Sequence, residues 1–217
     1  MAKNNNKKSS PVGMLVLTII FAIAFVLVLA TNAGVLFGQP KDLYDVIEEN
    51  GEPVKGEYVK LDMKATFGGY AETQYKINGI IPAGKMYHYV ALLDDGSVIS
   101  VSFRGNKMKE KFDKILSNTE AYYMSGDAGL LKDTVTVKGK LTTVAGDQGI
   151  YYTNAMTGYY DGNIYRFSID TTSKGTMFIV VIILAAIEVG CIIGFMGALK
   201  NKKKENEAPV QTADLEQ

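Results

Sequence analysis

The sequence has almost none of the residues from which common catalytic and metal sites are built. It contains one histidine, His88, and one cysteine, Cys191. The usual zinc sites take three or four ligands from His, Cys and acidic side chains, and a catalytic His needs a partner group within hydrogen-bond reach. The sequence also has no Ser-x-x-Lys, no Gly-x-Ser-x-Gly and no glycine-rich phosphate loop. We therefore expect no enzyme active site, no metal and no cofactor.

Disulfides and glycosylation sites are also absent. A single cysteine cannot form an intrachain disulfide, so any folded domain must be held by its own core. The sequence has no Asn-x-Ser/Thr acceptor, and 21 lysines stand against two arginines. These features fit a bacterial plasma membrane better than a eukaryotic secretory pathway. Nucleic acid is not an expected partner, because residues 38–174 carry 16 basic and 18 acidic side chains.

Two long apolar runs, residues 13–37 and 175–199, dominate what the sequence does contain. Each exceeds the roughly 20 residues that a helix needs to cross about 30 Å of hydrocarbon. Lysines precede the first run and follow the second, which predicts that both termini are cytoplasmic and that the segment between the runs is outside. We expect a multi-pass plasma-membrane protein in contact with the lipid bilayer.

A cleaved signal peptide is the alternative for the first run. Thr31 and Ala33 form a small-residue pattern of the kind that precedes a cleavage site. The apolar core from Met14 to Ala30 is longer than the roughly 7–15 residues of a signal peptide, which favours a retained helix. Cleavage would leave a single-span protein with the same outer domain.

The predicted organisation has six parts, and it resembles that of uncharacterised bacterial membrane proteins with two spans around an extracytoplasmic β-rich domain. The flanking "KNNNKKSS" and "KNKKK" segments and the spacing of the spans carry this resemblance, which is architectural and implies no activity. The parts are a cytoplasmic tail (1–12), a transmembrane helix (13–37), a juxtamembrane helix and linker (38–55), an extracytoplasmic β-rich domain (56–174), a second transmembrane helix (175–199) and a disordered basic cytoplasmic tail (200–217).

Alternating apolar and polar residues predict the strands of the outer domain. The clearest signal is a hairpin over 86–103, where Asp95-Gly96 supplies a tight turn. Helical spacing predicts a helix over 106–118 with Asn106 as N-cap, and Ser117 and Glu120 have the spacing of a capping box for a second short turn. Further strands are predicted at 58–67, 70–77 and 134–144, with one or two more in 149–170 around Asp161-Gly162.

The order of these elements is strand, strand, hairpin, helix and two or three strands. It resembles the five-stranded barrel of the OB-fold, which has a helix between its third and fourth strands. The fold class is therefore predicted as an α+β membrane protein, with two transmembrane helices flanking an antiparallel β-rich domain that is OB-like and carries one packed helix. Another antiparallel sheet with one packed helix is the alternative.

Tyrosine is abundant, with 13 residues, and six tyrosines are candidates for a recognition surface. Tyrosine offers wide, amphipathic contact area at a low cost in side-chain entropy. The alternative is that tyrosine packs well in half-buried sheets. The candidates are Tyr87, Tyr89, Tyr151, Tyr152, Tyr159 and Tyr160.

A carboxylate, Glu188, lies near the centre of the second apolar run. An ionised Glu at this depth costs about 3 kcal/mol or more, so we expect it to be protonated or paired across chains. The first run places no polar residue at its depth. On a helix, Glu188 projects away from a stripe of small residues that suits close helix packing, namely Ala186, Gly190, Gly194 and Gly197. The hypothesis is a homo-oligomer, or assembly with another membrane protein, through this helix; a lone protonated Glu is the alternative.

These features predict a non-enzymatic integral plasma-membrane protein. Its extracytoplasmic domain would bind or sense a partner in the envelope, or the chain would be an accessory subunit of a membrane complex. A membrane-anchored envelope enzyme or transporter subunit is the alternative, and it would need partner residues that the sequence does not display.

Overall fold

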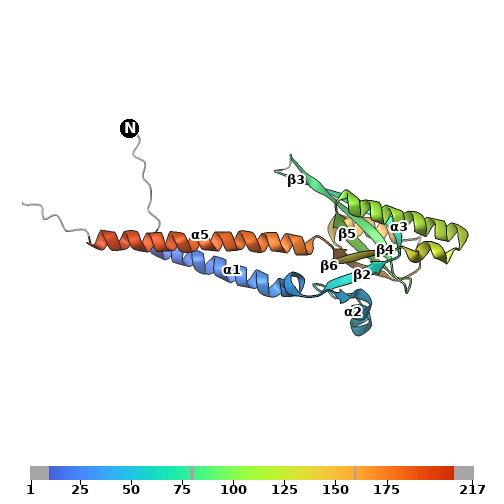
Figure 1. The fold of residues 1–217 in the computed structure, drawn as a ribbon, viewed down its shortest axis with the longest axis horizontal. Helices are drawn as coiled ribbons and strands as arrows, with labels where there is room; N and C mark the ends of the chain where they lie inside the picture. The colour runs from blue at the N-terminus through green and yellow to red at the C-terminus, as the bar shows by residue number, and fades with distance from the viewer. Residues whose placement is uncertain (1–9, 79–80, 159, 208–217) are drawn as a thin grey trace, which may run out of the picture. The chain divides into compact units, whose positions relative to one another are not determined.

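The structure is a computed structural model that describes residues 10–78, 81–158 and 160–207 (Figure 1). The chain divides into two compact units. One unit is Ala33–Met177, and the other joins Met1–Asn32 with Phe178–Gln217. The first is a mixed α and β domain and the second is helical, and each is described by itself.

The α and β domain is built on one open, seven-stranded mixed sheet in the order β1-β2-β6-β7-β5-β4-β3. Strand β1 is parallel to β2 and β5 is parallel to β7, whereas the other neighbours are antiparallel. The strands are β1 (Lys41–Asp42), β2 (Tyr58–Met63), β3 (Ala65–Ile77), β4 (Ile81–Leu92), β5 (Val98–Arg104), β6 (Val135–Thr143) and β7 (Ile164–Asp170).

One face of the sheet carries the larger apolar core, beneath α2 (Leu43–Asn50) and α3 (Asn106–Ser125). Because side chains alternate along a strand, Val101 and Phe103 of β5 point to this face. They pack in one cluster with Phe112 and Ile115 of α3, and the two Phe ring centroids lie 4.3 Å apart. These contacts make α3 the main cover of this face.

The short helix α2 confirms that a helix lies within residues 38–55. It begins after Asp42, whose side chain accepts a hydrogen bond from the backbone N–H of Tyr44, and it ends at Gly51, whose φ of 78° is left-handed. Leu43 and Val46 are fully buried in the larger core. The helix is thus held by caps at both ends and by its apolar side.

The opposite face is covered by α4 (Gly146–Met156), and this two-sided cover excludes the OB-like barrel. Tyr152 and Met156 of α4 pack on Val90 and Val98 of the central strands. A small barrel has one filled interior, whereas here both faces of the same strands bury apolar side chains under helices. The sheet ends at β1 and β3 without closing, so the OB-like prediction is wrong and the coarser α+β class holds.

The predicted hairpin and the strand over 134–144 are confirmed as β4–β5 and β6. At the hairpin turn the backbone N–H of Leu93 donates to the carbonyl of Ser97 (2.8 Å), and Gly96 has a φ of 78°. The predicted strand over 58–67 is instead two strands, because β2 ends at Met63 and β3 begins at Ala65.

Three local predictions are wrong. Helix α3 is continuous to Ser125, so Ser117 and Glu120 form no new cap, and Gly105 rather than Asn106 occupies the N-cap position. Residues 149–156, predicted as part of a strand, lie in α4. A short 3-10 helix, η1 (Ala128–Lys132), follows α3.

The helical unit contains most of α1 (Pro11–Phe37) and of α5 (Ser173–Glu207), which converge near the start of α1 in Figure 1. Both helices are long and apolar enough to cross a membrane, and almost none of their most apolar stretch is buried within the described residues. Met14 lies against Gly194, since a Cβ placed on Gly194 would come within 2.5 Å of the Met14 Cε. Residues 200–207 are helical, where a disordered tail was predicted.

Candidate functional site

The candidate tyrosines fall into buried and exposed groups. Tyr87 and Tyr89 belong to the larger core, and Tyr89 donates a hydrogen bond to Asp113 of α3 (2.5 Å). Burial, followed by this carboxylate, raises the pKa of Tyr89 to about 12. Tyr151 is exposed and Tyr160 is half-buried, whereas Tyr152 is 1% exposed. The sixth candidate, Tyr159, lies outside the described residues.

His88 is buried at the centre of a polar network on the α4 face of the sheet. Its Nδ1 lies 2.8 Å from the Ser102 hydroxyl, and its Nε2 lies 3.1 Å from Thr73 Oγ1 and 3.3 Å from the Gln148 side-chain nitrogen of α4. The Ser102 hydroxyl also shares a hydrogen bond with Ser168 (2.8 Å). Burial lowers the pKa of His88, which keeps the imidazole neutral near pH 7.

The His88–Ser102 pair has the residue types of a base and a nucleophile, but its position does not favour catalysis. Both side chains are buried, with exposures of 1% and 6%. Neither lines the two pockets described next. Within the described residues, no group of three or more His, Cys, Asp or Glu side chains could hold a metal ion. We interpret the pair as part of the polar interior.

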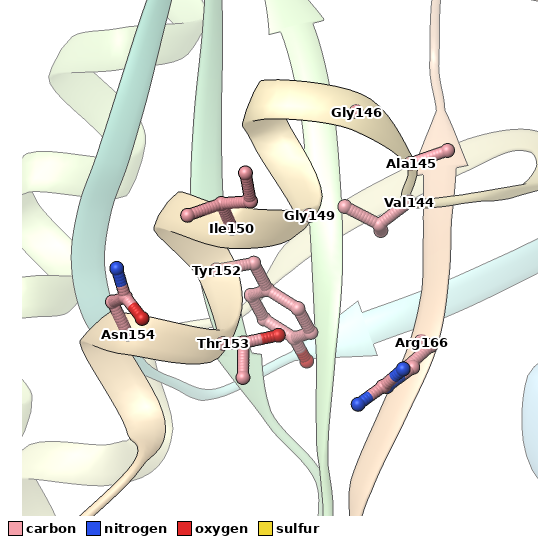
Figure 2. A pocket seen from close by; sticks show the side chains of 9 residues that line it. All are labelled: Val144, Ala145, Gly146, Gly149, Ile150, Tyr152, Thr153, Asn154 and Arg166. Carbon is pink, nitrogen blue, oxygen red and sulfur yellow. The ribbon is translucent and has the colours of Figure 1, made fainter.

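The first pocket, the α4 pocket, lies between α4, the segment before it and β7 (Figure 2). Its volume is about 380 Å³. The backbone N–H of Val144 donates to the carbonyl of Arg166 (3.1 Å), which holds the segment before α4 against β7. At the start of α4, Gly146 has a φ of 61°, and a Cβ there would meet no atom within 4 Å. The pocket is therefore open at this end.

Two side chains give the α4 pocket its chemistry, Tyr152 and Arg166. The Tyr152 hydroxyl is buried and has no hydrogen-bond partner among the described residues. Burial is the main cause that raises its pKa, so the phenol remains a protonated donor. Arg166 is exposed and makes no ion pair within the described part of the chain. In Figure 2 the Tyr152 ring extends from α4, and the Arg166 side chain extends from β7 toward it.

The second pocket, the basic groove, lies on the same face of the sheet as the α4 pocket. It is larger, at about 620 Å³. It contains cationic side chains from three separate segments: Lys55 before β2, Arg104 at the end of β5, and Lys140 of β6. Its lining continues along the first residues of α5 to Thr176 and Met177. The groove is thus basic and includes the start of the second apolar helix.

Packing fixes the Arg104 side chain within the basic groove. Its guanidinium carbon lies 4.6 Å from the centre of the Tyr75 ring, a cation–π contact between β5 and β3. The Tyr75 hydroxyl in turn contacts the sulfur of Met86 (3.7 Å), which is buried beside Arg104 in β4. Lys55 is placed by its neighbour, since the backbone N–H of Gly56 donates to the carbonyl of Leu141 (2.8 Å).

The acidic side chain of the basic groove, Asp170, is engaged in a turn. Its Oδ1 accepts hydrogen bonds from the backbone N–H (2.9 Å) and hydroxyl (2.8 Å) of Thr172. Asp170 is also the cross-strand neighbour of Lys140. Neither Lys55 nor Arg104 forms an ion pair within the described residues. Among the described residues, the lining therefore combines three cationic side chains with one carboxylate, which is already hydrogen-bonded.

In the helical unit, Glu188 is half-buried on the same side of α5 as the buried Cys191. Its Oε2 atom is buried and has no hydrogen-bond partner among the described residues. The contact of Met14 with Gly194 brings Thr18 closer to the level of Glu188 than the sequence indicated. The Thr18 hydroxyl, however, donates to the carbonyl of Met14 (3.0 Å).

The small residues of α5 lie mainly on its uncovered side. Ala186, Gly190 and Gly197 are exposed, whereas Gly194 is half-buried against α1. The structure therefore places three of the four small residues together on a side that no described residue covers.

Sequence reasoning did not find either pocket. The pocket residues come from segments far apart in the chain, and no local spacing brings Lys55, Arg104 and Lys140 together. One compositional signal was present: the chain has two arginines, Arg104 and Arg166, and each lines one of the two pockets. Because Arg is the better residue for bidentate recognition of carboxylate and phosphate, its rarity could have directed attention to these positions.

Residues 2–200 match a family model described as "Domain of unknown function (DUF8577)". The match spans most of the chain, so the chain belongs to this family. No curated protein and no solved structure matches it.

Proposed function

We propose that the chain is a membrane-anchored binding protein of the cell envelope, whose extracytoplasmic domain holds a ligand in the α4 pocket. Two helices of membrane-spanning length and composition support the anchor. The lysines that flank the apolar runs support an outside position for the α and β domain. The role proposed for this domain is binding or sensing rather than catalysis.

The observation that carries the proposal is the Tyr152 hydroxyl, which is buried and unpartnered among the described residues at the α4 pocket. Buried polar groups in proteins nearly always have a hydrogen-bond partner. Leaving one without a partner costs about 1–3 kcal/mol. A ligand atom that accepts a hydrogen bond from Tyr152 would remove this cost.

The side chains of the α4 pocket favour a ligand that carries a carboxylate or a carbonyl oxygen. Both Tyr152 and Arg166 donate hydrogen bonds, and Arg166 adds a positive charge. The apolar side chains of Val144 and Ile150 also line the pocket, which suits a ligand with a small apolar part next to its acceptor group.

Thermal unfolding of the full chain in a neutral detergent tests the proposal. Small carboxylates with an apolar part, from butyrate to benzoate, are the probes, and matched amines are the controls. At least one carboxylate should raise the Tm of the wild-type protein, and Tyr152→Phe should weaken its binding by about tenfold through loss of one hydrogen bond to a charged group. Arg166→Gln should weaken it by a similar factor.

The unliganded Tyr152→Phe variant provides an independent readout. If the hydroxyl is unsatisfied, its removal should leave stability unchanged or raise it by about 1 kcal/mol. Arg104→Gln, in the other pocket, is the matched control and should bind the carboxylates as the wild type does. Loss of stability in unliganded Tyr152→Phe, together with no carboxylate that discriminates the variants, would refute the proposal.

A further inference from the structure

We propose that the basic groove is a binding site for the phosphodiester group of an anionic phospholipid at the membrane surface. The groove is separate from the α4 pocket, and the inference does not depend on a ligand there. The inference is supported by the charge of the lining, the position of the groove along α5 and the balance of its polar and apolar side chains.

The charge of the groove is complementary to a phosphate. Lys55, Arg104 and Lys140 supply three positive charges from three segments of the domain. Their carboxylate neighbour, Asp170, already accepts two hydrogen bonds from Thr172. A guanidinium binds phosphate oxygens through two parallel N–H donors, and lysine acts as a point charge beside it.

The Arg104 side chain is already ordered in a position where it could bind a phosphate. The contact with the Tyr75 ring holds its guanidinium within the groove while leaving it without a carboxylate partner among the described residues. An arginine whose side chain is already ordered loses less conformational entropy when it binds. Because Arg104 forms no ion pair among the described residues, binding a phosphate does not require one to be broken.

The position along α5 gives the depth of the groove. Thr176 and Met177 line it, and both lie near the start of the apolar run of the helix. At 1.5 Å per residue, the step from Ser173 to Phe178 covers about 7.5 Å along the helix axis. The polar headgroup layer occupies roughly 5–8 Å on each side of the hydrocarbon. If α5 enters the bilayer at Phe178, the α5 residues that line the groove lie at the depth of lipid phosphates.

The remaining lining matches an amphipathic ligand. Met86, Leu141 and Met177 contribute apolar surface, whereas Thr142 and Ser173 contribute hydroxyl groups. A glycerol backbone with the first carbons of its acyl chains presents the same mixture next to its phosphate. A water-soluble phosphate ester shares the phosphate but has no need of the apolar part, and this difference separates the two sources in an experiment.

Native mass spectrometry of the full chain in a neutral detergent tests the inference. The probes are dioleoyl phosphatidylglycerol, dioleoyl phosphatidylcholine and glycerol 3-phosphate. We expect phosphatidylglycerol to bind tighter than phosphatidylcholine, because the choline cation is repelled by the groove. Arg104→Gln combined with Lys55→Gln should weaken binding of phosphatidylglycerol by at least about tenfold. Binding should also weaken as NaCl is raised.

Two controls keep the test decisive. Arg166→Gln removes the other arginine, outside the groove, and should retain wild-type binding of phosphatidylglycerol. Lys55→Gln alone changes an exposed side chain without touching the contact of Arg104 with Tyr75, so it should fold normally and still bind several-fold more weakly.

The possible results each decide the question. Equal binding of the two phospholipids, or equal binding by the wild type and the Arg104 and Lys55 variants, would overturn the inference. Glycerol 3-phosphate that binds as tightly as phosphatidylglycerol would overturn the lipid as the source and leave a phosphate-ester site. Selective binding of phosphatidylglycerol that depends on Arg104 and Lys55 would support the inference as stated.

Discussion

Single residues decide how the polar side of the sheet is organised. His88 occupies a position that an apolar residue would fill in an ordinary sheet core, and it is held there by Ser102, Thr73 and Gln148. Gln148 belongs to α4, so the imidazole joins the helix to the strands beneath it. The burial of His88 and these hydrogen bonds are those of a structural side chain.

Stability should fall as the pH drops below about 6.5, the pKa of histidine in an unfolded chain. Burial lowers the pKa of folded His88, with Asp170 opposing the shift, so the unfolded chain takes up a proton that the folded chain does not. The loss reaches at most about 1.4 kcal/mol per pH unit, the value for one proton. Urea unfolding of the full chain at pH 7.5, 6.5 and 5.5 measures it.

The control for this pH effect is His88→Gln, which removes the titrating group while keeping hydrogen-bonding atoms. Its stability should be nearly constant between pH 7.5 and 5.5. The carboxylates with lowered pKa, such as Asp113 and Asp133, lose their contribution only when the pH falls to about 4, near the pKa of unfolded Asp. An equal pH dependence in the variant and the wild type would show that another group is responsible.

At the scale of elements, local sequence was enough to predict the hairpin and β6. Two β-rich runs joined at Asp95-Gly96 mark the hairpin, and apolar and polar residues alternate along β6. It was misleading at α4. There the buried Tyr152 and Met156 are four residues apart, a helical spacing, but neighbouring tyrosines and glycines favoured a strand. The parallel pairing of β5 with β7 joins distant segments, and no local pattern encodes it.

The sites were less predictable than the elements. A pocket depends on which segments the sheet order brings together, and the order here places β6 and β7 between β2 and β5. Six tyrosines were candidates for a recognition surface in the sequence, yet Tyr87 and Tyr89 are core residues. Isolated residues such as Lys55 carried no signal, because a lysine in a loop is ordinarily a solvated surface residue.

We propose that α5 associates with a second copy of the chain, or with another membrane helix, through its uncovered small residues. Gly190→Leu should shift the protein toward the monomer by at least about tenfold, because a bulky side chain prevents close approach of helices. Light scattering of the detergent-solubilised full chain measures the change. A Leu at this position is tolerated by the helix itself, since a Cβ there meets no atom within 4 Å.

The matched control for assembly is Val189→Leu, one residue away and also exposed. It should leave the oligomeric state unchanged, since it lies off the stripe of small residues. Glu188→Gln tests the carboxylate separately, because Glu188 is on the side of α5 with Cys191. If Gly190→Leu and Val189→Leu behave alike, the small residues do not mediate assembly.

For the whole molecule, the proposed topology places both termini in the cytoplasm and the α and β domain outside. Met124, at the end of α3, is 88% exposed and is a suitable position for a label. The single native cysteine is buried, so it contributes little background. Met124→Cys should react with a membrane-impermeant maleimide on intact cells.

Lys202→Cys, in the last turns of α5, is the matching cytoplasmic position and is exposed within the described residues. It should react only after the membrane is made permeable. Labelling of Lys202→Cys on intact cells, or failure to label Met124→Cys there, would reverse or refute the topology, and the outer position of both pockets with it.

The two edge strands of the sheet differ greatly in how readily a strand of another polypeptide could pair with them. At one end β1 has two residues, too few to support pairing with a further strand. At the other end β3 has 13 residues, but its register shifts at three places, between Thr66 and Gly68, Gly69 and Ala71, and Tyr75 and Lys76. Each shift interrupts the row of backbone N–H and C=O groups. The sheet therefore has a long edge that resists pairing with strands of other chains, which should protect the domain from amyloid-like aggregation at high concentration.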